Sequence, residues 1–200
     1  MTEKFQNKYR IPSARLKNWD YGTNGAYFIT ICTQNREHFF GEIVETQFIA
    51  SEIGTMAEKY WMEIPHHFPY IELGNFVIMP NHVHGILIID KNVKTLQCNV
   101  SENESTVQTL QSTVQTLHCN VSTNKNQQMA NISPKSGTIS AIVRSYKSVV
   151  TKNAHFIHAD FGWQPRFHDH IIRNAPEWER IQTYIENNPM HWKEDKFYLV

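Results

Sequence analysis

The chain has 200 residues, of which 40% are hydrophobic and 12% aromatic, which excludes wholesale disorder and allows one domain with a hydrophobic core. No uncharged apolar run approaches the roughly 18 residues that a membrane-spanning helix needs, so we expect no membrane contact. Lysine plus arginine and aspartate plus glutamate both total 19, so net charge alone does not indicate a nucleic-acid-binding protein.

The first half of the chain predicts a strand, a helix and two further strands. Residues 26–33 are rich in β-branched and aromatic residues, which is typical of a strand. Residues 51–64 place apolar side chains at helical spacing, and Pro65 is expected to end that helix. Residues 70–79 and 82–90 then predict two strands joined by a short connection.

Residues 91–134 differ in composition from the rest of the chain. The sequence TLQCNVS at 95–101 returns almost unchanged as TLHCNVS at 116–122, and the stretch is polar and nearly free of aromatic residues. Two copies are too few for a repeat architecture. We therefore expect a low-complexity insert that forms a flexible loop within a single domain spanning 1–200.

Regular patterns return after the insert. Residues 139–150 place apolar side chains on one helical face, and residues 169–173 predict a short strand. A last helix is expected from about 175, with Pro176 in its first turn, to Asn188. The order β-α-β-β-α-β-α predicts an α+β fold in which helices pack on an antiparallel sheet.

Two histidines are the first candidates for chemistry. On a strand, His82 and His84 share one face, where two imidazoles could bind one divalent cation. Gly85 beside them lacks a side chain and is expected to let a substrate backbone come near. The alternative is a pair of partly exposed histidines on a sheet edge. Two ligands make a weak site, so a third is required.

A tyrosine and an asparagine on the last helix are the next candidates. Tyr184 and Asn188 are four residues apart and share one helical face, where a phenol and an amide oxygen could meet a metal held by the histidines. A phenol has a pKa of about 10 and is a poor nucleophile at neutral pH unless a metal polarises the phosphate that it attacks. Alternatively, Tyr184 is a core aromatic of an amphipathic helix.

Charge is segregated along the chain although it balances overall. Residues 1–20 and 135–173 carry an excess of basic side chains, whereas 37–72 is mostly acidic. This pattern predicts either a basic surface for phosphates or an ordinary solvated surface. The candidate DNA-binding side chains are Arg10, Arg15, Lys17, Arg144, Lys147 and Arg166.

Three motifs in this order, MPNHVHG at 79–85, WQPRFHDHIIR at 163–173 and YIENNP at 184–189, resemble the REP-associated tyrosine transposases. These belong with the single-tyrosine insertion-sequence transposases of the HUH endonuclease superfamily. The resemblance covers nearly the whole chain except 91–134. It implies a ferredoxin-like sandwich, with an antiparallel sheet, helices on one face and a C-terminal helix that carries the tyrosine.

The resemblance also implies roles for single residues. His82 and His84 match the family's metal-binding pair, and Tyr184 matches its nucleophile. Asn188 stands where the insertion-sequence relatives have a glutamine, and its amide is expected to be the third ligand of Mg²⁺ or Mn²⁺. Tyr146 on the earlier helix is the alternative nucleophile.

The implied function is that of a transposase: a metal-dependent single-strand DNA endonuclease and strand transferase that acts on hairpin-flanked DNA through a 5′-phosphotyrosine. We expect a bacterial cytoplasmic enzyme, since the cysteines form no disulfide framework. The resemblance implies either a monomer or a homodimer. One alternative is a catalytically inactive, domesticated DNA-hairpin-binding protein. The other is a metal-dependent nuclease without a covalent intermediate.

Aromatic and histidine side chains of the second motif have two possible uses. Trp163 and Phe167 could stack on unpaired bases, although a core position is expected for Trp163. His168 and His170 are expected to form structural hydrogen bonds.

Overall fold

The computed structural model describes residues 4–5, 8–9, 15, 19–93 and 133–198. The sequence-based predictions for Arg10, Lys17 and residues 94–132 lie outside the described residues. No helix in the described ranges combines the length and the apolar character that a bilayer crossing requires.

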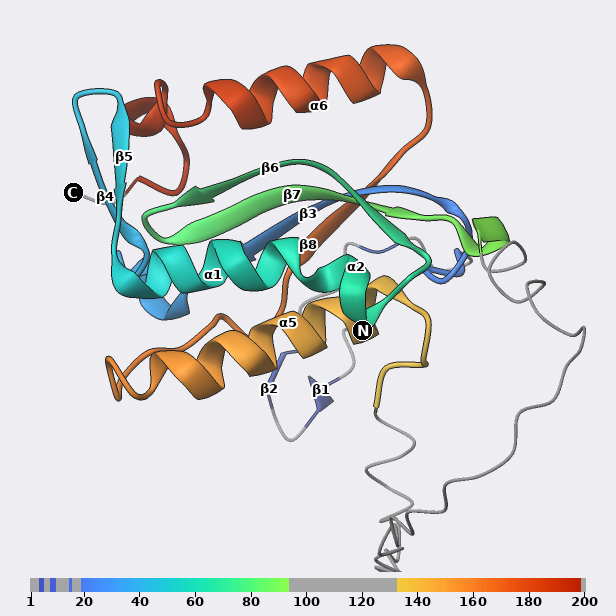
Figure 1. Ribbon diagram of the computed structural model, residues 1–200, viewed down its shortest axis with the longest axis horizontal. Helices are drawn as coiled ribbons and strands as arrows, with labels where there is room; N and C mark the ends of the chain where they lie inside the picture. Colours follow the sequence, from blue (N-terminus) through green and yellow to red (C-terminus); the bar gives the residue numbers. More distant parts are fainter. Residues whose placement is uncertain (1–3, 6–7, 10–14, 16–18, 94–132, 199–200) are drawn as a thin grey trace, which may run out of the picture.

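A four-stranded antiparallel sheet forms the centre of the fold (Figure 1). Its β-branched and aromatic residues favour the extended backbone. The strands lie in the order β6-β7-β3-β8. Their bounds are β3 (Gly25–Cys32), β6 (Ile71–Met79), β7 (His82–Ile89) and β8 (His168–Ile172). With one helix after β3 and one after β7, this is the ferredoxin-like β-α-β-β-α-β arrangement, so the predicted fold class is confirmed.

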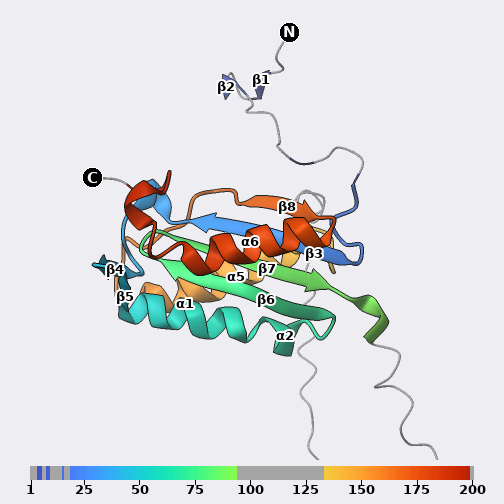
Figure 2. The ribbon, with the colours of Figure 1, turned by 90° about the horizontal axis from the view of Figure 1, so that it is seen from above.

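Helices lie on both faces of the sheet. α1 (Glu52–Met62) and α5 (Ile139–Ala154) cover one face and enclose the main hydrophobic core with it. The C-terminal helix α6 (Ala175–Asn187) covers the other face, where Ile181 and Ile185 pack on Ile86 of β7. Figure 2 shows α6 from its own side, lying over the sheet. The expected third helix is therefore present on the face opposite α1 and α5.

Short elements complete the described chain. They are β1 (Lys4–Phe5), β2 (Lys8–Tyr9), η1 (Gln34–Arg36), the hairpin β4 (Gly41–Val44) and β5 (Gln47–Ala50), α2 (Ile64–His67), η2 (Lys91–Val93) and η3 (Trp192–Glu194). Pro65 does not simply end a helix, because α1 stops at Met62 and the proline occupies the first turn of α2.

Alternation along β7 decides which side chains reach which face. Val83 and Leu87 point into the main core, whereas Ile86 points toward α6, so His82 and His84 also lie on the α6 face. Gly85 therefore lies on the opposite face, where a Cβ atom would collide with the ring of Trp61 in α1. The expectation that Gly85 admits a substrate is wrong. The glycine makes room for a core tryptophan.

Candidate active site

His82 and His84 form a buried pair at the start of β7. Their side chains are almost fully enclosed, and their ring centroids lie 4.4 Å apart. The strand is an interior one, paired with β3 on one side and β6 on the other. The alternative of two partly exposed histidines at a sheet edge is therefore wrong.

Asn81 fixes the orientation and the tautomer of His82. The Nδ2 group of Asn81 donates to the carbonyl oxygens of Arg36 at 3.1 Å and Phe197 at 2.9 Å, which identifies its other side-chain atom as the oxygen. That oxygen lies 2.8 Å from Nδ1 of His82, so Nδ1 must carry the proton. Nε2 of His82 keeps its lone pair, and it is a buried atom without a hydrogen-bond partner among the described residues.

His84 is held from both of its nitrogens. Nδ1 lies 2.9 Å from the hydroxyl of Thr30 on β3, and Nε2 lies 3.2 Å from the phenolic oxygen of Tyr184. Burial lowers the pKa of His82 to about 3, and burial together with the nearby His82 lowers the pKa of His84 as well. Both imidazoles are thus neutral at physiological pH, which is the state that binds a cation.

Two oxygen-bearing side chains complete the group. Asn188, the residue that caps the end of α6, is buried, and its Nδ2 donates to Oδ2 of Asp195 at 3.1 Å. Its Oδ1 atom has no hydrogen-bond partner in the described part of the chain. His82, His84 and Asp195 each offer a ligand atom, and these atoms lie within 4.8 Å of one another. The sequence analysis missed Asp195, because no local pattern around it indicates a ligand.

Tyr184 reaches the same point from α6. Its phenolic oxygen lies 3.2 Å from Nε2 of His84 and 3.4 Å from Oδ2 of Asp195. Burial of the hydroxyl and the Asp195 carboxylate raise the pKa of the phenol to about 12. The side chain remains 39% exposed, so Tyr184 is not a core aromatic.

Tyr146 lies on the other side of the sheet. It belongs to α5, it is 2% exposed, and its hydroxyl donates to the carbonyl oxygen of Ala57 at 3.1 Å. Burial raises its pKa above the ordinary range. The sheet itself separates this phenol from the histidine pair, so the alternative nucleophile has no access to the site.

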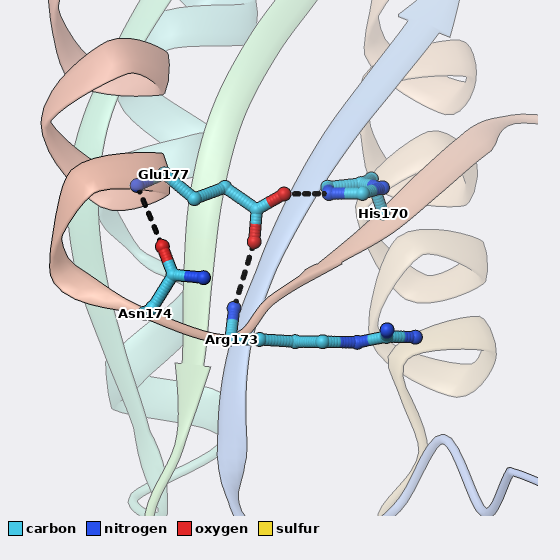
Figure 3. Close-up of polar contacts among 4 residues, drawn as sticks. All are labelled: His170, Arg173, Asn174 and Glu177. Atoms are coloured by element: carbon cyan, nitrogen blue, oxygen red, sulfur yellow. Dashed lines mark hydrogen bonds and ion pairs between the residues drawn. The ribbon is translucent and has the colours of Figure 1, made fainter.

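The first turn of α6 is tied to β8 (Figure 3). Asn174 caps the helix by accepting the N–H of Glu177 at 2.9 Å. The Glu177 carboxylate in turn accepts the N–H of Arg173 at 2.9 Å and lies 2.7 Å from Nε2 of His170. These contacts fix where the helix starts and therefore where Tyr184 stands two turns later. They also give His170 the structural hydrogen bond that was expected.

A cleft of about 410 Å³ opens beside Tyr184, between α6 and the strands β3, β7 and β8. It is bordered by aromatic, basic and acidic side chains. These include Phe28, Thr30, His168, His170, Arg180 and Lys196, together with Glu194 and Asp195.

The described members of the basic set predicted to contact DNA do not line this cleft. Arg15 forms an ion pair with Asp169 at 2.9 Å, and its guanidinium also donates to Ser140 of α5. Lys147 donates to the carbonyl oxygen of Gln164 at 2.6 Å, and burial lowers its pKa to about 8. Arg144 and Arg166 are exposed elsewhere. Among the residues that the structure describes, the lysine and arginine side chains at the cleft are instead Arg180 and Lys196.

The aromatic residues of the second motif are structural. Trp163 packs against the main core, and its Nε1 donates to the carbonyl oxygen of Lys147 at 3.2 Å, as expected for a core residue. The ring of Phe167 packs on the same core and stacks against the Arg15 guanidinium at 4.7 Å.

Comparison with known proteins places the chain in a family. A Haemophilus influenzae protein described as uncharacterized is 35% identical over 191 residues, with 94% of this chain and 92% of that protein covered. No protein-family model matches the chain.

Among solved structures, a REP-associated tyrosine transposase bound to a REP hairpin is similar, with a TM-score of 0.52 and 18% identity over 92% of this chain and 77% of the other. A candidate transposase from Deinococcus radiodurans matches at a TM-score of 0.41 and 14% identity, over 88% of this chain and 97% of the other. The chain therefore belongs to one protein family with the H. influenzae protein, and its fold is that of the REP-associated tyrosine transposases.

Proposed function

We propose that the protein is a transposase-type enzyme that nicks and rejoins single-stranded DNA with Tyr184 as its nucleophile. The observation that carries the proposal is the 3.2 Å contact between the phenolic oxygen of Tyr184 and Nε2 of His84. A phenol at the edge of a buried histidine pair, and still partly exposed to solvent, can meet both a metal-bound phosphate and an incoming DNA strand.

Mg²⁺ or Mn²⁺ would be held by His82, His84 and Asn188, with Asp195 as an additional carboxylate ligand. The donor atoms suit such an ion, because Nε2 of His82 and Oδ1 of Asn188 are buried lone-pair atoms that have no partner in the described structure. When bound, the ion supplies Lewis-acid polarisation of a phosphoryl oxygen. The buried, neutral histidines keep their lone pairs available for it.

The chain's own residues would carry out the covalent step. The phenolic oxygen of Tyr184 forms a bond to phosphorus and loses its proton, and the bond between phosphorus and the 3′ oxygen of the preceding nucleotide breaks. The products are a 5′-phosphotyrosine and a free 3′-OH, the 3′ oxygen having gained a proton. The phosphotyrosine retains the energy of the broken phosphodiester, so rejoining requires no nucleotide cofactor.

Hairpin-flanked DNA is the proposed substrate. The similar solved structure contains a REP hairpin, which supports the same class of ligand for this chain. A domesticated binding protein without activity is the less favoured reading, because the histidine pair, Tyr184 and Asn188 all converge on one point.

The test is a cleavage assay with the purified full chain, Mg²⁺ or Mn²⁺, and labelled single-stranded oligonucleotides that carry hairpins from the flanks of its own gene. Denaturing gels compare the wild type with Tyr184→Phe and Tyr146→Phe. We expect a covalent protein–DNA band that disappears only in Tyr184→Phe. Cleavage without an adduct in all three proteins would leave a hydrolytic nuclease, and binding without cleavage under either metal would leave a hairpin-binding protein.

A further inference from the structure

We propose that the cleft beside Tyr184 seats the nucleotide next to the scissile phosphate, with its base against Phe28 and its phosphate near His168, Arg180 and Lys196. The inference rests on the proposed function and adds a substrate subsite to it. The cleft measures about 410 Å³, within the range of roughly 300–1,000 Å³ that is usual for small-molecule sites. It opens directly onto Tyr184 and His84.

The register of the sheet connects the metal site to this cleft. His84 of β7 pairs with Thr30 of β3, and Thr30 pairs with His168 of β8, so the three side chains form one row on the α6 face. In the next row, Phe28 of β3 pairs with His170 of β8. Neighbouring strands are about 4.8 Å apart, so His168 stands roughly 10 Å from His84. A DNA strand that presents a phosphate to Tyr184 therefore runs over these rows.

The two β8 histidines have different roles. Nε2 of His170 is 2.7 Å from the Glu177 carboxylate, which holds its ring in place (Figure 3). The His168 side chain is exposed and makes no hydrogen bond within the described part of the chain. His168 is thus the imidazole of this strand that remains available to a ligand.

Two cations border the same space. Arg180 and Lys196 line the cleft, and neither forms an ion pair with any other described residue. The Asp195 carboxylate at the cleft already accepts hydrogen bonds from Asn188 at 3.1 Å and from the N–H of Phe197 at 2.7 Å. The Lys196 ammonium lies 4.9 Å from the centre of the Phe197 ring, a contact that leaves its charge without an anionic partner among the described residues. Cations without an ion pair beside an open cleft suit a phosphate, which is acceptor-only and charged.

Phe28 supplies the apolar wall. Its ring stacks on His84, with centroids 5.2 Å apart and planes inclined by 28°, and it meets Tyr184 edge-on at 6.1 Å. Aromatic side chains next to basic residues are the usual platform for unpaired bases, and the stacking tolerates any base. This arrangement predicts a subsite that requires a base without specifying which one.

The first experiment is a double-mutant cycle between protein and DNA, measured as equilibrium binding by fluorescence anisotropy in EDTA, so that no cleavage occurs. The probe is a hairpin oligonucleotide from the gene flank with a single-stranded extension, in which each extension position is made abasic in turn. In the wild type we expect one position to weaken binding by roughly tenfold. In Phe28→Leu the intact and abasic probes should bind alike, because the stacking partner is gone.

A second variant keeps the test independent of packing around Phe28. Arg180 is exposed on α6, so the Arg180→Gln variant should fold normally. It should bind the DNA more weakly, and the slope of log affinity against log salt concentration should be smaller by about 0.7, the value for one phosphate contact to a single strand. Arg173→Gln is the matched control: an exposed arginine beside the same helix, outside the cleft, which should leave the slope unchanged.

The outcomes separate this inference from the proposed function. Equal abasic penalties in the wild type and Phe28→Leu, or equal salt slopes in Arg180→Gln and the wild type, overturn the subsite even if the Tyr184 adduct forms. A Phe28-dependent abasic penalty in a protein that forms no adduct establishes the nucleotide site and overturns the tyrosine chemistry instead.

Discussion

The phenolic oxygen of Tyr184 lies 3.2 Å from Nε2 of His84, although 100 positions separate the two residues. The contact joins α6 to the central strand β7. The proposed nucleophile and the proposed metal ligand are thus placed by different elements, so each can be altered without removing the other.

The two candidate tyrosines should differ in their effect on the covalent adduct when their hydroxyls are removed. In Tyr184→Phe, adduct formation should fall by at least roughly 10³-fold, because the nucleophile is lost. Its free energy of unfolding should fall by about 1 kcal/mol, because the contact of the hydroxyl with Nε2 of the buried His84 is lost. In Tyr146→Phe, loss of the buried hydrogen bond to Ala57 should cost about 1 kcal/mol and leave the adduct intact. Denaturing gels and urea unfolding measure the two effects.

Asp195 should contribute to metal binding through its charge. Asp195→Asn keeps the size of the side chain but removes a carboxylate from a group whose ligand atoms lie within 4.8 Å of one another, so Mn²⁺ affinity should fall roughly tenfold or more. Isothermal titration of the full chain with MnCl₂ measures this. Glu194→Gln removes the neighbouring exposed carboxylate and serves as the control. Equal Mn²⁺ affinity in Asp195→Asn and the wild type would exclude Asp195 as a ligand.

Asn81 should act on the metal through His82. Asn81→Ala removes the acceptor that holds the proton on Nδ1 of His82, and we expect Mn²⁺ affinity to fall by about 10- to 100-fold. It also leaves the carbonyl oxygens of Arg36 and Phe197 without this donor, which should cost about 1–3 kcal/mol of stability.

Thr30→Val is the corresponding variant for His84, and it should weaken Mn²⁺ binding with a smaller loss of stability, because it removes one buried hydrogen bond whereas Asn81→Ala removes three. The prediction for Asn81 fails if its alanine variant is destabilised but binds Mn²⁺ with wild-type affinity at a temperature where it is fully folded.

Local periodicity was enough to predict much of this site. His82 and His84 alternate along a strand, and Tyr184 and Asn188 are one helical turn apart, so each pair shares a face whatever the rest of the fold does. The same rule does not say which face of the sheet lies toward the main core and which lies toward α6. Gly85 was expected to serve the substrate, but its place one residue beyond His84 puts it under Trp61 in the main core.

Features that depend on tertiary packing could not be predicted from the sequence. Asp195 reaches the histidines because Trp192 and Phe197 on either side of it pack against Cys32 and Met79. The hairpin β4–β5 turns at Glu45, with a φ of 58° and none of the glycine or asparagine that signals such a turn. Counting charges likewise could not show that α5 and its basic residues lie on the face opposite α6.

The buried histidines should make the stability of the metal-free protein depend on pH. Burial lowers the pKa of His82 to about 3 and shifts the pKa of His84 in the same direction, whereas both histidines in the unfolded chain titrate near the ordinary value of about 6.5. Below pH 6.5 the unfolded state therefore binds more protons than the folded state. The free energy of unfolding should fall with decreasing pH, by about 1.4 kcal/mol per pH unit from His82 alone between roughly pH 6.5 and 3.

Urea unfolding in EDTA at a series of pH values from 7.5 to 5 measures this dependence. His82→Gln should flatten the curve below pH 6.5, because one of the groups that take up protons on unfolding is gone. His66→Gln, which removes an exposed histidine from α2, is the matched control. A His82→Gln curve parallel to that of the wild type would mean that His82 has the same pKa in the folded and unfolded states, so burial would not keep it neutral at low pH. In that case its Nε2 lone pair would be lost to protonation below about pH 6.5, and metal binding through His82 would weaken at that pH.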